Sequence, residues 1–237
     1  MEEKLNILAV VAHPDDMEIL CGGTMAKFSR LGHKVTVCHV CDGGKGSKSH
    51  SSEELIKIRH KEALESAKLI KAEMIWAGIP DGEVVLNLDN RIKIIDIIRK
   101  SQPDLILTHS PGDYHVDHIN TGKLVFEAIY LADLPLFKTE NKATEKLPYL
   151  YYMETLGSGN FIPEEYVDIT DTIDIKIEMM LKMRSQLGWL KEMHNCDAPE
   201  YIKTVAAFRG YQAGVKYAEA FVQQKMYSQG LTERILP

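Results

Sequence analysis

Short apolar runs rich in β-branched residues alternate with helical patterns through the first half of the chain. The apolar runs predict strands at 5–12, 34–40, 74–79 and 105–109. Between them, amphipathic patterns with polar starts predict helices at 18–31, 52–71 and 90–100. Strands that alternate with helices favour parallel pairing with helical crossovers. The pattern therefore predicts an α/β fold with a doubly wound, mostly parallel sheet.

The second half of the chain is less regular. Its pattern predicts a helix at 116–131, a polar excursion at 135–147, and short strands at 149–154 and 166–169. Two helices, at 171–187 and 199–210, and a tail segment at 218–226 complete the prediction. No internal repeat or low-complexity linker divides the sequence. We therefore expect a single domain over residues 1–237.

Composition narrows the class of protein. The 237 residues are 45% hydrophobic and 26% charged, which is typical of a globular protein rather than a disordered or fibrous one. The net charge of -6 comes without a basic stripe, so we expect no binding to nucleic acid or to an anionic membrane. The start of the chain lacks a signal-peptide pattern, and no apolar run approaches the roughly 20 residues of a membrane span. These features predict a cytoplasmic location.

The four cysteines form no dense disulfide framework, which agrees with reduced thiols in the cytoplasm. The spacing of Cys38 and Cys41 is also found in zinc and redox motifs. Strand alternation places Cys38 and His39 on opposite faces of the sheet, and no second cysteine pair completes a structural zinc site. We therefore interpret these cysteines as small buried thiols.

A first cluster of chemically active residues, His13-Pro14-Asp15-Asp16, follows the first predicted strand. Pro14 biases His13 toward an extended backbone, so His13 ends the strand and the two aspartates open the next helix. Adjacent residues at a helix start point in different directions. One aspartate can therefore bind a metal while its neighbour faces an attacking water, although simple helix capping also accounts for a single acid there.

A second cluster, His115-Val116-Asp117-His118, follows the fourth predicted strand. His115 and His118 lie about one helical turn apart and share a face, and Asp117 between them can orient an imidazole through its second nitrogen. Both clusters are expected at the carboxyl edge of one sheet, where ligands of such folds bind. Together they predict a three-ligand site for a catalytic divalent metal.

A nucleotide site is the main competing interpretation of this fold class. A dinucleotide fold has a glycine-rich turn after its first strand, whereas this chain has two carboxylates that repel a phosphate. The segment 42–47 resembles a phosphate loop only loosely, because the Gly-Lys-Ser order is absent. We interpret the glycine-rich and serine-rich segment 42–52 as a flexible rim.

These motifs resemble the LmbE-like, or PIG-L-like, family of zinc-dependent deacetylases. The resemblance spans nearly the whole chain. Its motifs are Ala12 through Glu18, Gly22-Gly23-Thr24, Arg59 through Ala63, His115 through His118, Ser185-Gln186, and Arg209-Gly210 through Phe221. It implies a Rossmann-like three-layer fold and hydrolysis of an N-acetyl group on glucosamine or a glucosamine conjugate. It also implies a homo-oligomer, with hexamers among the relatives.

Position by position, the resemblance implies that His13, Asp16 and His118 are the metal ligands and that Asp15 is the general base. The metal would be Zn2+, although the donor set also suits iron(II), cobalt or manganese. Such an ion lowers the pKa of bound water from 15.7 to about 7. A positioned base typically contributes about 10²- to 10⁴-fold to the rate.

The same resemblance implies that His115, held by Asp117, stabilises the tetrahedral oxyanion. Arg59 would bind a substrate oxygen or anionic group, and its spacing alone is equally typical of a helix-surface ion pair. Two positions depart from the family pattern: Arg184 stands where many relatives have histidine, and Asp113 where some have tyrosine. Both departures concern contacts to the substrate, so the substrate does not follow from the resemblance.

Three hypotheses remain open at this point. The first is a zinc enzyme that removes acetate from an acetylated amino sugar or its glycoside. The second is a metal-dependent amidase for a non-sugar N-acyl substrate, and the third is a nucleotide-binding module without catalysis. The bound metal and the acetate released from sugar and non-sugar amides distinguish them.

Overall fold

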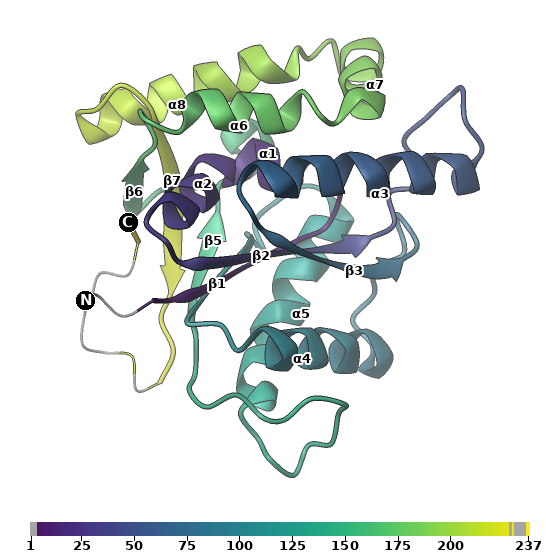
Figure 1. The fold of residues 1–237 in the computed structure, drawn as a ribbon, viewed down its shortest axis with the longest axis vertical. Coiled ribbons are helices and arrows are strands. Elements are labelled where there is room, and N and C mark those ends of the chain that lie inside the picture. Colours follow the sequence, from purple (N-terminus) through teal and green to yellow (C-terminus); the bar gives the residue numbers. More distant parts are fainter. Residues whose placement is uncertain (1–3, 228, 230–235) are drawn as a thin grey trace.

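The protein is built around a seven-stranded sheet with the strand order β3-β2-β1-β4-β5-β7-β6 (Figure 1). The structure, a computed structural model, describes residues 4–227, 229, 236 and 237. The strands are β1 (Asn6–Val11), β2 (Lys34–Cys41), β3 (Glu73–Ile79), β4 (Leu105–His109), β5 (Tyr149–Met153), β6 (Glu165–Asp168) and β7 (Ala218–Gln224). All pairings from β3 to β5 are parallel, and β7 pairs antiparallel with both β5 and β6. The predicted α/β fold with a mostly parallel sheet is confirmed.

Helices cover both faces of the sheet. They are α1 (Asp16–Leu20), α2 (Gly22–Arg30), α3 (Ser52–Leu69), α4 (Leu88–Ser101), α5 (Val116–Ala132), α6 (Ile173–Met180), α7 (Arg184–His194) and α8 (Ala198–Ala213), with a short 3-10 helix, η1 (Leu156–Ser158). No helix among the described residues is both long and apolar enough to cross a membrane.

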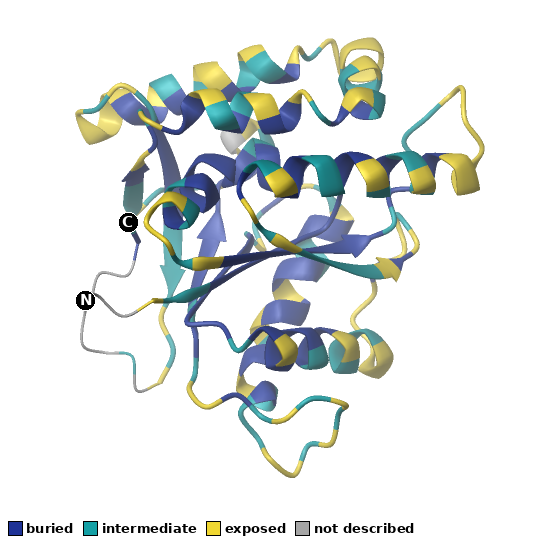
Figure 2. Cartoon of the chain, in the orientation of Figure 1, coloured by how far each residue is buried: buried dark blue, intermediate teal, exposed yellow. Residues whose placement is uncertain are grey.

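Two hydrophobic cores lie on opposite faces because successive residues of β1 point to opposite sides. Ile7, Ala9 and Val11 belong to the core under α1, α2, α3, α6 and α8. Leu8 and Val10 belong to the core over α4 and α5. In Figures 1 and 2, α4 and α5 lie below the sheet and the other helices above it, and the sheet is the most continuously buried layer. This is a three-layer arrangement.

The chain reverses direction across the sheet between β1 and β4. From β1 it proceeds outward to β2 and β3, and then returns to β4 on the other side of β1. The segments that follow β1 and β4 therefore lie side by side at the carboxyl edge, where the strand order switches and α/β folds bind their ligands. Both predicted clusters occupy these segments.

The predicted helix at 18–31 is two helices, α1 and α2. Cys21, with φ -140° and ψ 12°, interrupts the helical backbone between them. The first amides of α2 need acceptors, and the Glu219 carboxylate accepts the N–H of Gly23 at 2.8 Å and of Thr24 at 2.7 Å. A side chain at Gly23 would lie 2.8 Å from Ile169. The break therefore comes from a partner about 200 residues away.

The predicted helix at 171–187 is also divided, into α6 and α7. The Ser185 backbone N–H and hydroxyl donate to the Glu62 carboxylate of α3 at 2.9 and 2.6 Å. This acid satisfies the start of α7 and holds it against α3. The sequence prediction missed the break because the partner lies on another element.

The prediction of a tail segment at 218–226 was wrong. Most of this segment is β7, which lies between β5 and β6 inside the sheet. Ala218, Ala220 and Phe221 are buried there. Glu219 is also buried, which is tolerated because Lys176 Nζ lies 2.5 Å from its Oε1. Glu219 weakened the strand pattern in the sequence, because its partner Lys176 on α6 could not be inferred from the sequence alone.

Candidate metal centre

Two turns at the carboxyl edge of the sheet bring the predicted ligands together. After β1, the amides of Asp15 and Asp16 both donate to the His13 carbonyl, at 3.1 and 3.3 Å. After β4, a loop leads to α5, which starts directly after His115, so that His118 lies in its first turn. His13, Asp16 and His118 are all buried. The structure thus brings together residues about 100 positions apart in sequence.

The donor atoms of the three candidate ligands lie close together, with one histidine nitrogen near each oxygen of Asp16. His13 Nδ1 lies 3.3 Å from His118 Nε2 and 3.4 Å from Asp16 Oδ2, and His118 Nε2 lies 3.3 Å from Asp16 Oδ1. Ligands of a tetrahedral zinc ion at bond lengths of about 2.0–2.1 Å are about 3.3–3.4 Å apart. The donor types and their separations therefore fit a transition-metal ion.

The charge around these histidines also suits a cation. Burial works against a charge on His118, but Asp16 and Asp113 outweigh it and raise its pKa to about 9. The pKa of His13 is likewise raised despite its burial, by hydrogen bonds to Asp117, Asp16 and Asp81. Metal ligands must be unprotonated, so an ion that binds here replaces these protons. The site is thus built to hold positive charge.

Each ligand histidine is oriented by a carboxylate on its other nitrogen. His13 Nε2 lies 3.2 Å from both Asp117 Oδ2 and Asp81 Oδ1, and His118 Nδ1 lies 3.2 Å from Asp113 Oδ2. Carboxylates in this position fix the tautomer and raise the basicity of the ligating nitrogen. The nitrogen of each ring that faces Asp16 is thereby the one that can bind a metal ion, once the ion has replaced its proton.

Asp117 holds a different histidine from the one that we expected. Its buried carboxylate faces His13 and also accepts the N–H of Gly82 at 2.7 Å and of Val84 at 3.2 Å. Only its backbone N–H reaches His115, donating to Nδ1 at 3.3 Å. Asp117 stands in the first turn of α5, and its side chain points away from His115 toward the segment after β3. The expected pairing of the Asp117 carboxylate with His115 is therefore wrong.

His109, the last residue of β4, packs against the ligand His118. Its buried ring stacks on His118 with a centroid distance of 4.0 Å. Burial lowers the pKa of His109 to about 4, so the ring is neutral. Its Nε2 lies 3.2 Å from Asp16 Oδ2 but accepts the Ala12 N–H at 2.9 Å. This hydrogen bond occupies the lone pair of His109 Nε2. We therefore interpret His109 as a packing partner of His118 and not as a metal ligand.

Asp15 and Arg59 form a buried ion pair beside the ligands. Arg59 Nη2 lies 3.2 Å from Asp15 Oδ1 and donates to the Pro14 carbonyl, and Nη1 donates to the Gly43 carbonyl. Burial raises the pKa of Asp15 to about 6, against the opposing effect of Arg59. A general base needs a pKa near the working pH, so Asp15 suits that task. Arg59, expected to contact substrate, is instead largely engaged with Asp15 and the two carbonyls.

Three site residues were missed in the sequence. Asp81 was not singled out in the sequence, and Asp113 was interpreted as a departure from the family pattern. Cys41 was predicted to be a buried thiol and is one, and its Sγ lies 3.7 Å from Asp117 Oδ2. Cys38 belongs to the same core, over α4 and α5, and is also buried. Burial raises the pKa of Cys41 to about 11, so it is a neutral thiol. The position of Asp81, an acidic residue directly after the end of β3, was the feature of the sequence that could have indicated its role.

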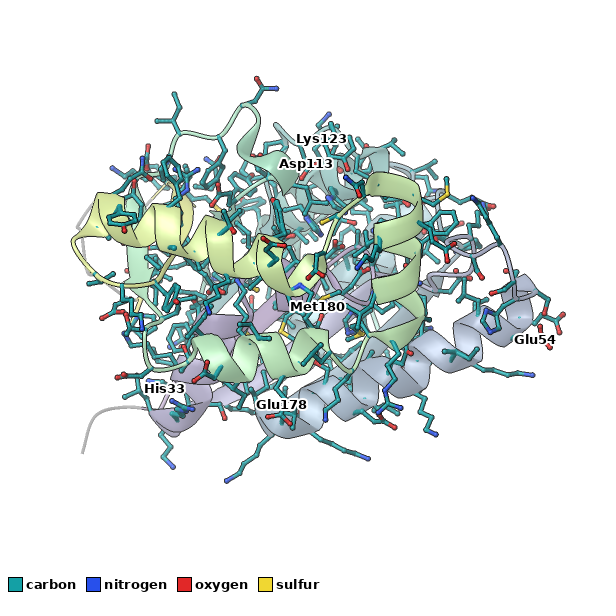
Figure 3. All side chains as sticks on the ribbon, turned by 90° about the horizontal axis from the view of Figure 1, so that it is seen from above. His33, Glu54, Asp113, Lys123, Glu178 and Met180 are labelled. Atoms are coloured by element: carbon teal, nitrogen blue, oxygen red, sulfur yellow. The ribbon has the colours of Figure 1, made fainter. Side chains whose placement is uncertain are left out.

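A cleft of about 510 Å³ leads to these residues. Asp15, Arg59 and His115 line it near the ligands, and Tyr114 and His194 line it with large exposed fractions. Residues of α7 and α8 also line it. In Figure 3, which looks onto α6, α7 and α8, Asp113 and Met180 lie on opposite sides of α8. The ligands therefore lie beside the helical layer and open to a space large enough for a small organic molecule.

Comparison with known proteins identifies relatives of the whole chain. The model of the PIG-L family, described as GlcNAc-PI de-N-acetylase, matches residues 8–129. The diacetylchitobiose deacetylase of Thermococcus kodakarensis is 29% identical over 225 residues, which cover 90% of this chain and 80% of that protein.

Solved structures show the same fold. The N,N'-diacetylchitobiose deacetylase from Pyrococcus horikoshii, solved with its inhibitor MPG, superposes with a TM-score of 0.81 at 30% identity, covering 92% of this chain and 83% of that one. The 4-carboxy-2-hydroxymuconate hydratase of Pseudomonas putida superposes with a TM-score of 0.82 at 24% identity, covering 97% and 98%. At 24% identity, the similarity to the hydratase shows a shared fold and nothing about activity.

Proposed function

Because the chain belongs to the PIG-L family of GlcNAc-PI de-N-acetylases, we propose that it is a metal-dependent deacetylase that removes acetate from N-acetylglucosamine or one of its conjugates. Relatives named as diacetylchitobiose deacetylases align with 90% or more of the chain. A relative 28% identical over 203 residues is a 1D-myo-inositol 2-acetamido-2-deoxy-alpha-D-glucopyranoside deacetylase. These substrates share an acetylated amino sugar.

The ligands in this proposal are His13, Asp16 and His118, and the metal is zinc. The observation that carries it is the 3.3 Å separation of His13 Nδ1 from His118 Nε2, which is the spacing of two ligands of a tetrahedral ion, with an oxygen of Asp16 within 3.4 Å of each nitrogen. When bound, such an ion polarises the acetyl carbonyl and makes water acidic enough to attack at neutral pH. The same donors also accept iron(II), cobalt or manganese.

Asp15 is the general base of the reaction. Its carboxylate lines the cleft beside the ligands, and Arg59 holds it in place from the protein side. It takes a proton from the attacking water and returns a proton to the amine as the C–N bond breaks, so that amide and water give amine and acetate.

His115 stabilises the charge that develops on the carbonyl oxygen. Its Nδ1 accepts the Asp117 N–H, so in the neutral ring the proton lies on Nε2. Burial lowers the pKa of His115, which favours this neutral form. A fixed N–H donor at the cleft is the kind of group that serves an oxyanion.

The test is acetate release from N-acetylglucosamine, diacetylchitobiose and a simple N-acetyl amine by zinc-loaded protein. We expect Asp15→Asn to keep zinc and lose about 10²- to 10⁴-fold in kcat. His13→Ala should lose both zinc and activity. His50→Ala, on the exposed rim outside the cleft lining, is the matched control and should keep both. An Asp15→Asn enzyme with near-normal turnover contradicts the base role.

The alternatives give different results in the same assay. Acetate from the simple amine at the rate of the sugars favours the non-sugar amidase. Hydration of an unsaturated acid without acetate release favours a reaction like that of the hydratase relative. Nucleotide binding without catalysis is disfavoured, since two carboxylates follow β1 and the relatives named above are deacetylases. The cytoplasmic location and the homo-oligomer remain predictions.

A further inference from the structure

A second group of possible metal donors lies at the Nε2 side of the His13 ring, whereas the catalytic ligands meet at Nδ1. Asp117 Oδ2 and Asp81 Oδ1 each lie 3.2 Å from His13 Nε2. Cys41 Sγ lies 3.7 Å from Asp117 Oδ2, and donor atoms of His13, Cys41 and Asp117 all lie within 4.8 Å of one another. We call this group the thiol site, and it consists of His13, Cys41, Asp81 and Asp117.

The separations within the thiol site match those between ligands of a tetrahedral zinc ion. With bonds of about 2.0–2.2 Å to nitrogen and oxygen and about 2.3 Å to sulfur, N and O lie about 3.3–3.5 Å apart and S and O about 3.5–3.7 Å apart. The distances in the thiol site, 3.2 Å from nitrogen to each oxygen and 3.7 Å from sulfur to oxygen, agree with these ranges to about 0.1 Å. Four protein donors without a position for water are typical of a structural zinc site.

Two carboxylates converge on a single N–H in the thiol site. His13 Nε2 carries at most one proton, yet Asp81 and Asp117 both face it at the same distance. The Asp117 side chain is fully buried and that of Asp81 is 13% exposed, so little water screens the repulsion between the two acids. A divalent ion supplies two charges and several bonding directions at once, which a proton on His13 does not. The charge of the group therefore favours a metal ion.

Backbone N–H groups already hold both carboxylates in the direction that an ion needs. Asp117 accepts the N–H of Gly82 at 2.7 Å and of Val84 at 3.2 Å. Asp81 Oδ2 accepts the N–H of Lys45 at 3.2 Å, which leaves its Oδ1 toward the imidazole. Hydrogen bonds of this kind orient the ligands of a metal ion and reduce the cost of binding it.

Cys41 belongs to the thiol site because of the way in which β2 ends. Its N–H donates to the Ala12 carbonyl at 2.8 Å, which places Cys41 beside His13. The register of β2 against β3 shifts between His39 and Cys41, and such irregularities re-aim side chains near strand ends. Among the described residues, Cys38 is in no group of donors that could share an ion. Sulfur ligation in the thiol site therefore depends on Cys41.

We propose that the thiol site binds a second divalent ion of the zinc class, with His13 bridging it to the catalytic ion. Thiolate, imidazole and carboxylate donors together suit zinc and cobalt. The ion joins the ends of β1 and β2, the turn after β3 and the first turn of α5. Asp81 lines the cleft, which gives the ion a route to the site. Cys41 and His13 each give up a proton to it, so it binds more weakly than the catalytic ion.

The test titrates the metal-free chain with Co²⁺ and measures the bound metal and the absorption of the complex. Cobalt replaces zinc in tetrahedral sites, and a thiolate ligand adds an intense charge-transfer band in the near ultraviolet that nitrogen and oxygen ligands lack. The catalytic ligands contain no sulfur, so the band reports the thiol site alone. We expect two ions per chain, with the band growing as the second one binds. Saturation at one ion per chain without the band overturns the proposal.

Two matched cysteine variants locate the second ion. Cys41→Ala should lose the band and weaken the second ion by more than about 100-fold, because even an outer partner of a ligand is worth about 10- to 100-fold. Binding of the first ion shows that this variant is folded. Cys38→Ala removes another buried thiol from the same strand and should keep both the band and the second ion. A second ion that Cys41→Ala binds as tightly as the wild type lies elsewhere on the chain and overturns the proposal.

A carboxylate variant tests the site without changing the thiol. Asp81→Asn lies in a turn at the cleft, and we expect it to weaken the second ion by more than about 100-fold as well. Excess Co²⁺ should still produce the band in this variant, because Cys41 remains. Unchanged affinity for the second ion in Asp81→Asn contradicts the four-ligand site.

The thiol site and the proposed function fail separately in these experiments. Two ions and the thiolate band, without acetate release from any acetylated amino sugar, support the thiol site and refute the deacetylase. Acetate release by a chain that binds one ion without the band supports the deacetylase and refutes the thiol site. Because the second ion joins four segments of the fold, the urea midpoint should also rise a second time as it binds. This second rise should occur in Cys38→Ala and be absent in Cys41→Ala.

Discussion

Replacing Asp117 by asparagine tests the arrangement that holds the metal ligand His13. The carboxylate is fully buried. Its Oδ2 lies 3.2 Å from His13 Nε2 and 2.7 Å from the Gly82 N, and its Oδ1 lies 3.2 Å from the Val84 N. Asparagine has nearly the same shape but only one acceptor oxygen. The substitution therefore removes a charge and one acceptor with little change in volume.

Two separate losses follow. If the amide oxygen of the asparagine faces His13 and Gly82, its NH₂ group faces the Val84 N–H. The Val84 N–H then has no acceptor, and such a buried donor costs about 1–3 kcal/mol of stability. The loss of the carboxylate behind His13 should weaken metal binding by about 10- to 100-fold, as for other outer carboxylates of histidine ligands. That factor equals about 1.4–2.8 kcal/mol of binding free energy. The two terms are measurable independently.

The first term is measured by urea unfolding of metal-free protein, and the second by competition for zinc with a chelator at fixed pH. The control is Asp96→Asn on α4, outside the cleft lining, whose carboxylate accepts the N–H and the side-chain amide of Asn141, both at 2.8 Å. It should lose stability and keep its zinc affinity. Zinc affinity of Asp117→Asn within about threefold of the wild type, a difference of less than 1 kcal/mol, would refute the reasoning.

Four further predictions test the metal, the core and the thiols. Removal of the metal with a chelator should abolish acetate release, and zinc at about 100 times its Kd should restore it and add about 2.7 kcal/mol of stability; unchanged activity without metal contradicts the proposal. Lys176→Met leaves Glu219 buried without its cation and should cost about 3–5 kcal/mol in urea unfolding, so a loss below about 1 kcal/mol would mean that the pair is unimportant. Gly122→Ala places a methyl group against the His109 carbonyl, so we expect a loss of about 1–3 kcal/mol and weaker zinc binding, and wild-type values for both would show that α5 can shift freely. A thiol reagent on native protein should modify Cys196 first, because the other three cysteines are buried, and rapid modification of all four would contradict their burial.

Much of the fold could be predicted because its signals are local. The buried strands β1, β2 and β4 are short runs rich in apolar and β-branched residues, since both faces of a parallel sheet are covered by helices. Polar residues that directly follow such strands lie at the carboxyl edge whatever the rest of the chain does. The two clusters could therefore be placed at one edge, although no local signal states which neighbours each side chain meets.

The features that were mispredicted all depend on distant partners. The interior strand β7 includes Glu219, whose burial depends on Lys176, about 40 positions away. The break between α1 and α2 depends on the same carboxylate. The pairing of Asp117 with His13 depends on how α5 docks beside β1, and the roles of Asp81 and Asp113 depend on turns that approach the ligands only in the folded chain.

The sequence by itself determined the alternation of strands and helices through β4 and the chemical types at the strand ends, because hydrophobic periodicity and residue identity are local properties of the chain. Tertiary structure alone decided which imidazole meets which carboxylate, which acids are buried, and that residues of α7 and α8 line the cleft beside the ligands. Those properties depend on distances and burial between segments far apart in sequence, which no local pattern encodes.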